Sequence, residues 1–556
     1  MMRIRDASSS VKVARRSVLG LGVVIASTLS AVVAEEPPGG REPAIVVRAV
    51  HPDRQAAAVV GLFADSRSPH PAAAMAAWRR ATADISQLGK PLQAVAAIFN
   101  PQMIAEWKAF HDVELAVGFA PEDGKPLWRV IAPEDDGTLS ALITSLRLSG
   151  GANEPPIADP PVVVERLGGP GAAVGARLPE GVAFAGRRDE LASAVQVLRA
   201  KAEADPKATE PLPAGVDGSG FRLSFDLDRL APPGGANLTL SRIATAARAG
   251  GVKTSLGRLA LDDDHLDLNL STGLDPERVP AAAEGQGAVL DPSWLACVPA
   301  QSAQAAVAIA FGRGADYWNR LFDVADRVDR ADPARAQLAP LRVRLNFLAM
   351  ARGVRLEADL WPILRGVTVA GLADPRQAGR AGGVLLALHT DRAEDAERIL
   401  ARVVRPMSGL FGGGKNAAES KTVALGRVSG RPLEAAVRGT SVLVGWGDKT
   451  LELGLQSIDR PEHSAAAVVE RERAGAGAGE RPTSRAGVYW PGRLALPMLG
   501  LNALSPLTVS LSEGAPVVWR GGEEGGRAWD LVRWPDLRRL VARFLDRVPQ
   551  SPPDTP

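Results

Sequence analysis

VAFAGRRDELASAVQVL (residues 182–198) and VLVGWGDKTLELGLQSI (residues 442–458) are two stretches with one shared pattern. Each starts with a strand-like run, turns through a glycine and continues as a helix that begins near an aspartate. The apolar residues of the two helices lie a constant 260 residues apart: Leu191, Val195 and Leu198, then Leu451, Leu455 and Ile458. Because i, i+4, i+7 spacing forms one helix face, each stretch predicts a strand followed by an amphipathic helix.

The surroundings of the two stretches extend this similarity over residues 112–204 and 366–460. Both segments predict two strands, a helix, three short strands and a closing helix. The predicted elements lie at 114–120, 127–131, 139–146, 162–165, 172–177, 182–185 and 189–198, and at 367–371, 384–388, 391–405, 422–425, 433–437, 442–444 and 448–458. This order predicts an α+β fold, with antiparallel sheets and helices packed on one face. The interpretation is an internal duplication of paired domains, and the alternative is chance similarity between strands rich in Val and Ala.

Composition divides the rest of the chain into further segments. Middle strands are predicted at 221–225, 259–261, 266–270 and 306–311, a middle helix at 316–328, and a closing helix at 537–544. Ala-Gly-Ala-Gly-Ala-Gly at 474–479 is typical of a linker. The predicted organisation is a signal peptide at 1–34, an α+β module at 42–204, a middle α+β region at 218–365, the second repeat copy at 366–460, a linker at 471–487, and C-terminal strands and a helix at 488–550.

The first 34 residues predict the location of the protein. Five basic residues and one acidic residue precede an uncharged run over 18–34, and Val32 and Ala34 suit the groove of a signal peptidase. This pattern predicts export to the periplasm or the extracellular space. Arg15-Arg16-Ser17-Val18-Leu19 also fits a twin-arginine signal, so the Sec and twin-arginine routes both stay open. The alternative is an uncleaved N-terminal membrane anchor, because the run is near the lower length limit for a bilayer span.

Charge and cysteine content limit the possible partners. Removal of the leader, with its five bases and one acid, changes the formal net charge from +2 to −2. A nearly neutral chain lacks the basic surface that nucleic-acid binding requires, so no nucleic-acid partner is predicted. Cys297 is the single cysteine, so an intramolecular disulfide is impossible. Its apolar neighbours predict a buried, unreactive thiol.

One stretch approaches the pattern of a nucleotide-binding loop. Gly409-Leu410-Phe411-Gly412-Gly413-Gly414-Lys415-Asn416 has the P-loop spacing up to the lysine, but Asn416 replaces the hydroxyl residue that binds magnesium. A P-loop also follows a strand and begins a helix, whereas a helix is predicted before this stretch. We interpret it as a loop, and no cofactor is predicted.

Acidic and histidine residues could serve as metal ligands, but their spacing does not match a known metal-binding motif. Asp262-Asp263-Asp264-His265 offers ligands for a hard cation but lacks the EF-hand spacing, and a solvated hairpin turn is the favoured interpretation. Glu134-Asp135-Asp136 is interpreted as the acidic start of a helix. No two of the six histidines lie within five residues of each other: His51, His70, His111, His265, His389 and His463. No metal is therefore predicted.

Nucleophilic and acid–base catalysis have no sequence support either. Gly426-Arg427-Val428-Ser429-Gly430 places its serine one position too late for a nucleophile elbow. Carboxylate pairs for glycoside cleavage depend on a distance in space that the sequence does not give. The catalytic residues, if any, stay unknown.

The leader, the repeated sheet-and-helix pattern and the richness in Arg, Ala and Gly resemble the large exported proteins of uncharacterised function found in planctomycete-like bacteria. The resemblance implies an exported protein but transfers no active-site residue. The resulting hypothesis is a non-enzymatic binding or scaffold protein of the cell envelope, with an unknown envelope protein or polymer as its partner. It would contact a membrane only if the signal stays uncleaved. The rival is an exported hydrolase that acts on envelope polymer with unrecognised Asp or Glu residues.

Overall fold

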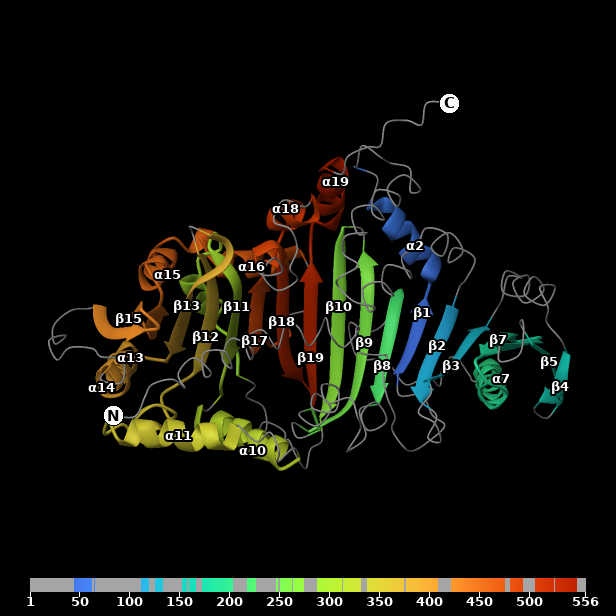
Figure 1. Ribbon diagram of the computed structural model, residues 1–556, viewed down its shortest axis with the longest axis horizontal. Coiled ribbons are helices and arrows are strands. Elements are labelled where there is room, and N and C mark those ends of the chain that lie inside the picture. Colours follow the sequence, from blue (N-terminus) through green and yellow to red (C-terminus); the bar gives the residue numbers. More distant parts are fainter. Residues whose placement is uncertain are drawn as a thin grey trace.

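The computed structural model confirms the α+β class with antiparallel strand pairing (Figure 1). It describes residues 45–62, 65, 112–119, 126–133, 153–157, 160–166, 173–203, 218–226, 247–248, 251–262, 264–274, 288–312, 314–331, 338–374, 377–408, 422–475, 481–493, 506–524 and 526–547. The leader, the P-loop-like stretch 409–416, the acidic triplet 134–136 and the predicted helix 139–146 lie outside these residues.

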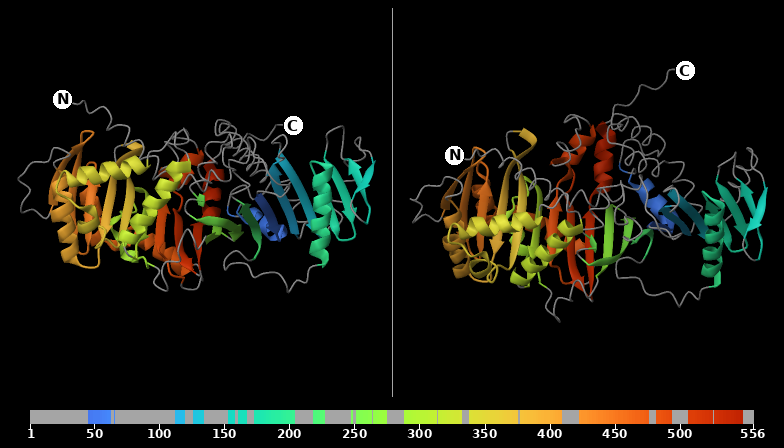
Figure 2. Two further views of the ribbon diagram at one scale, coloured as in Figure 1. Left: turned by 90° about the horizontal axis from the view of Figure 1, so that it is seen from below. Right: turned by 60° about the horizontal axis from the view of Figure 1, so that its bottom comes forward.

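The strands within the described residues form one sheet of 19 strands. Their antiparallel pairings give the order β14-β15-β16-β13-β12-β11-β17-β18-β19-β10-β9-β8-β1-β2-β3-β7-β6-β5-β4. The molecule is therefore elongated along the direction in which the strands follow one another (Figure 2).

The strands fall into two groups along the chain. We call residues 45–274 the first half; its strands are β1 (Ile45–Val50), β2 (Asp112–Phe119), β3 (Pro126–Pro133), β4 (Asn153–Ile157), β5 (Val162–Arg166), β6 (Val174–Leu178), β7 (Gly181–Ala185), β8 (Gly220–Asp226), β9 (Val252–Asp262) and β10 (His265–Leu274). We call residues 303–534 the second half; its strands are β11 (Ala303–Ala310), β12 (Gly366–Asp374), β13 (Gln377–His389), β14 (Thr422–Val428), β15 (Arg431–Arg438), β16 (Ser441–Trp446), β17 (Arg485–Tyr489), β18 (Val517–Glu524) and β19 (Arg527–Trp534).

Helices occupy the connections between these strands. They are α2 (Pro52–Gly61), α7 (Arg188–Glu203), α10 (Gly314–Ala331), α11 (Leu338–Met350), α12 (Leu356–Asp359), α13 (Ala393–Ile399), α14 (Arg405–Met407), α15 (Thr450–Asp459), α16 (Ala465–Gly475), α18 (Pro506–Ser512) and α19 (Leu537–Arg547). The 3-10 helices η2 (Pro292–Cys297) and η6 (Pro461–His463) and the π-helical turn η4 (Leu400–Val404) complete the set. Among the described residues, no helix has the length and apolar character that a bilayer crossing needs.

The two halves share one pairing order. The first half runs β5-β6-β7-β3-β2-β1-β8-β9-β10, and the second runs β14-β15-β16-β13-β12-β11-β17-β18-β19. Helices α7 and α15 follow the corresponding strands β7 and β16. Only β4 has no counterpart within the described residues.

The halves meet where β10 pairs with β19, which we call the seam. The hairpins β9–β10 and β18–β19 both close through two-residue loops, at Asp262 with His265 and at Glu524 with Arg527. These equivalent positions are 262 residues apart, and Asn269 pairs across the seam with Leu531, which also lies 262 residues further along. Equivalent residues therefore face each other, as in a symmetric dimer, and the halves have an approximate two-fold relation.

The covering of the sheet differs from the predicted single helical layer. In the second half, Leu443 packs in one core with α15, α16 and η2, while its neighbours Val442 and Val444 pack in another with α12, α13 and η4. Successive strand residues point to opposite faces, so helices cover both faces of the second half. The physical reason is the uninterrupted apolar run of β16, which is typical of a strand buried on both sides. In the first half, α7 packs against one face through Leu191, Ala194 and Val195.

Regular structure also extends into segments predicted as connectors. Helix α16 continues to Gly475, and β17 begins at Arg485, so both ends of the predicted linker 471–487 are ordered. Strand β17 lies between β11 and β18 inside the sheet. Strands of the predicted middle region likewise continue the sheet on both sides, because β8 pairs with β1 and β11 pairs with β12.

Candidate functional site

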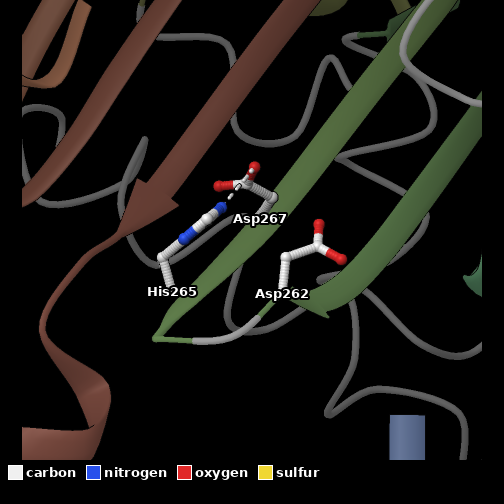
Figure 3. Close-up of side chains that lie close together, drawn as sticks. All are labelled: Asp262, His265 and Asp267. Atoms are coloured by element: carbon white, nitrogen blue, oxygen red, sulfur yellow. Dashed lines mark ion pairs between the residues drawn. The ribbon is translucent and has the colours of Figure 1, made fainter. Parts of the chain in front are cut away.

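Ionisable side chains gather at one end of the seam, at the turn between β9 and β10 (Figure 3). Asp262 ends β9, while His265 and Asp267 begin β10. One ligand atom from each of the three residues lies within 4.8 Å of the others. His265 Nε2 is 3.5 Å from Asp267 Oδ2. Asp, His and Asp are residue types that bind divalent metals, so this seam cluster is the first candidate site.

Arginines already occupy the carboxylates of the seam cluster. Arg533 on β19 lies directly opposite Asp267 on β10. Its Nε and Nη2 donate to Asp267 Oδ1 and Oδ2 at 2.8 and 2.6 Å. Asp267 is only 5% exposed, and Arg258 Nη2 lies 3.6 Å from Asp262 Oδ2. A cation would have to displace Arg533 from both oxygens, so the arrangement fits an ion-pair network that joins the two halves better than a metal centre.

The turn itself holds the C-terminal helix. The Asp264 carbonyl oxygen accepts from the Leu537 backbone N–H at 2.9 Å, and its carboxylate accepts from the Arg538 N–H at 2.7 Å. These two donors belong to the first turn of α19. The backbone N–H groups of a helix's first turn have no acceptor within the helix. Asp264 thus acts as a cap that comes from a distant part of the chain, and Asp263 lies outside the described residues. The predicted hairpin turn is confirmed by the pairing of Asp262 with His265, but Asp264 is not simply solvated, because α19 folds back onto it.

Glu472 on α16 adds a carboxyl group near the seam. Partial burial raises the pKa of Glu472. The positive charge of Arg533 is the largest effect that opposes this shift, and Arg471 and His265 oppose it as well, while the negative charge of Asp536 reinforces it. A raised pKa at a partly buried carboxyl group is a feature shared by catalytic acids and by structural ion-pair networks.

His389 forms a second candidate, inside the second half. Its ring stacks on Trp294 at a centroid distance of 4.5 Å. Nε2 lies 2.8 Å from Thr368 Oγ1, and Nδ1 lies 2.8 Å from Ser441 Oγ. Because Thr368 donates its own proton to the Trp294 carbonyl oxygen, Nε2 is assigned as the donor to Thr368, and Nδ1 accepts from Ser441.

This Ser–His pair is a poor catalytic dyad. Burial lowers the pKa of His389 to about 3, and Asp291 opposes that shift only in part. A general base works best when its pKa is near the working pH, and in a triad a carboxylate would take the place of Thr368. The network instead satisfies the polar atoms of a buried histidine.

The remaining candidate residues lie in the core, in a hairpin turn or at the ends of helices. Cys297 is buried, as predicted, and burial raises the pKa of its thiol to about 12. Ser429 and Gly430 form the turn between β14 and β15, with the positive φ angles of a tight hairpin turn. A nucleophile elbow joins a strand to a helix, whereas this turn joins two strands. His51 precedes α2 and His463 ends η6, while His70 and His111 lie outside the described residues.

Sequence reasoning missed the role of Arg533, Arg258 and Glu472 around the acidic turn. Arg533 on β19 and Glu472 on α16 are more than 200 residues from the turn in the chain, whereas Arg258 lies beside it on β9. The only available signal was the alternation of Asp267, Asn269 and Ser271 with leucines in β10, which marks a strand with one polar face.

Comparisons with known proteins add little. No protein family and no curated protein matches the chain. Among solved structures, the chain is similar to crystal form IV of TP0453, with 12% sequence identity and a TM-score of 0.22. That match covers 48% of this chain and 91% of TP0453.

Proposed function

We propose that the protein is an exported binding or scaffold protein of the bacterial cell envelope, without catalytic activity of its own. The observation that carries this proposal is that the clustered ionisable groups bond to one another or to buried polar atoms of the protein. At the seam they pair with each other across β10 and β19, and at His389 they satisfy a buried ring. Both candidate sites thus stabilise a long continuous sheet, which suits a protein that works through its surface.

We also infer that the two halves arose by tandem duplication. The common pairing order and the equal spacing at the seam support this inference. Two equivalent halves in one rigid sheet would present two related surfaces at a fixed separation, and such an arrangement favours simultaneous attachment to a repeating envelope component.

The proposed location rests on the leader. Mass spectrometry of the native N-terminus should find a chain that begins at Glu35, since the small residues Val32 and Ala34 precede that bond. An intact N-terminus in the membrane fraction would favour the anchor, and the full-length chain free in the cytosol would contradict export.

Binding and hydrolysis can be separated in one experiment. Purified protein from Glu35 onward is incubated with isolated envelope sacculi and with membranes, and the pellet and supernatant are analysed. We expect the protein in the pellet, without release of sugar reducing ends or peptide amines. Fragment release that depends on the protein would contradict the binding proposal.

A hydrolase is the second candidate because the pKa of Glu472 is raised, as a general acid requires. If fragments are released, Glu472→Gln should abolish the release. Glu470→Gln, on the same helix, is the matched control and should keep it.

A further inference from the structure

Large apolar side chains are exposed along α11. Val343, Phe347 and Met350 are 67%, 70% and 70% exposed. Their i, i+4, i+7 spacing places them in one stripe on the helix. Leu345 and Leu348 on the same helix, and Leu321 on α10, are also exposed. Contiguous exposed apolar groups of this kind mark an interaction surface in a folded protein.

One side of α11 faces the protein. Ala349 is buried in the core that contains α12 and α13. The Arg342 guanidinium lies 4.5 Å from the centre of the Phe322 ring on α10. Helix α10 is itself anchored by Trp318, which stacks on Trp361 at 4.4 Å. The two helices lie along the lower edge of the second half in Figure 1, so the apolar stripe is carried by a fixed support.

The charge of α11 itself is positive, since it carries Arg342 and Arg344 and no acidic residue. Residues 333–356 contain no acidic residue and five arginines: Arg335, Arg342, Arg344, Arg352 and Arg355. Arg344, Arg352 and Arg355 are exposed in the structure. A second copy of this surface would repel the first, whereas an anionic surface would be attracted. Arginines beside exposed apolar residues are typical of helices that lie on membranes with anionic lipids.

The length of α11 fits the plane of a membrane and not a crossing. Its 13 residues span about 20 Å at 1.5 Å per residue, which is shorter than the hydrocarbon core of a bilayer. Arginine side chains can extend their guanidinium groups to the headgroups while their aliphatic stems stay among the acyl chains.

We propose that α11 binds the surface of a bilayer that contains anionic phospholipid. Val343, Phe347 and Met350 enter the interface between headgroups and acyl chains, and the arginines contact lipid phosphates. This proposal rests on the proposed envelope function and specifies its partner. It can fail without that function failing, because the sacculus assay above does not depend on lipid.

The test is binding to vesicles, with the chain from Glu35 onward, because the apolar leader would itself bind lipid. Vesicles of phosphatidylcholine with one quarter phosphatidylglycerol are compared with pure phosphatidylcholine. We expect binding to the anionic vesicles that weakens in high salt. The triple variant Val343→Ser/Phe347→Ser/Met350→Ser should bind about 10-fold more weakly. Val163→Ser/Val289→Ser removes similarly exposed apolar groups elsewhere and should bind as the unchanged protein does.

A variant that reports binding by an added signal shows that lost binding in the triple variant is not merely lost folding. Phe347→Trp should show a blue shift of its added fluorescence with anionic vesicles, and brominated lipid should quench it, relative to the unchanged protein. Arg344→Glu/Arg352→Glu should reduce binding to anionic vesicles selectively. Equal binding to neutral vesicles, a triple variant that binds normally, or the absence of vesicle binding would each overturn the proposal, the last leaving an acidic protein as the occupant.

Discussion

The Asp267–Arg533 pair is the most buried ion pair at the seam, with both carboxylate oxygens bound by one guanidinium. Removal of one partner leaves the other buried without compensation. Asp267→Asn should therefore lower the free energy of unfolding by about 3 kcal/mol. Denaturant unfolding, followed by tryptophan fluorescence, measures this change.

The matched control removes both charges. Asp267→Leu/Arg533→Met replaces the pair with apolar groups, and its stability should return to within about 1 kcal/mol of the unchanged protein. A double variant as unstable as Asp267→Asn would show that the pair is favourable beyond the cost of an uncompensated charge.

His389 gives the stability a pH dependence. Burial lowers its pKa from 6.5 to about 3, so between these values the unfolded chain binds a proton that the folded protein does not. Its contribution is therefore complete above pH 6.5 and is lost as the pH falls towards 3, by about 1.4 kcal/mol per pH unit. The free energy of unfolding, measured with urea at pH 7, 5 and 4, should decrease less with falling pH in His389→Gln than in the unchanged protein. Parallel declines in the two proteins would contradict this assignment.

At the scale of the element, helix α19 depends on a cap from β9–β10. Asp264→Ala removes the carboxylate that accepts from Arg538 N–H, and this loss should cost about 1 kcal/mol. Hydrogen exchange should accelerate in residues 537–547 and not in α15. Asp264→Asn keeps a side-chain oxygen in the same place and should preserve the protection. Equal exchange in Asp264→Ala and the unchanged protein would argue that packing alone holds the helix.

The predicted boundaries of helices and strands were accurate where the sequence pattern that marks them is local. Helix α15 and strand β16 lie within two residues of their predicted positions, because glycine, aspartate and the apolar stripe are local signals. Strand β13 extends seven residues further towards its N-terminus than predicted. Its first residues, Gln377 to Gly383, have no strand pattern, and their pairing with β12 extends the strand.

For the whole molecule, the continuous sheet predicts that the halves stay together without a covalent connection. Eight residue pairs join β10 and β19. Insertion of a protease site after Gly285, followed by cleavage, should leave two fragments that co-elute in size-exclusion chromatography, because the seam buries backbone hydrogen bonds and the Asp267–Arg533 pair. The same cleavage in Asp267→Asn should release more free fragment. Complete separation after cleavage of the unchanged protein would show that the seam alone is too weak.

The candidate site could be predicted only in part. Asp262, Asp264 and His265 were visible as an acidic turn, since they are adjacent in the sequence. Arg533 and Glu472 were not, because their distance in sequence from the turn exceeds 200 residues. Only the pairing of β10 with β19 brings Arg533 to Asp267, and that pairing converts a possible cation site into a neutralised ion-pair network.

The α+β class, the order of strands around 182–198 and 442–458, and the burial of Cys297 could all be predicted from the amino-acid sequence, because periodicity and composition are local properties of the chain. Three features became visible only in the folded protein: β8–β10 and β17–β19 continue the same sheet, helices cover both faces of the second half, and the halves join edge to edge. Strand partners are chosen by backbone hydrogen bonds between distant segments, and such bonds leave little trace in side-chain patterns.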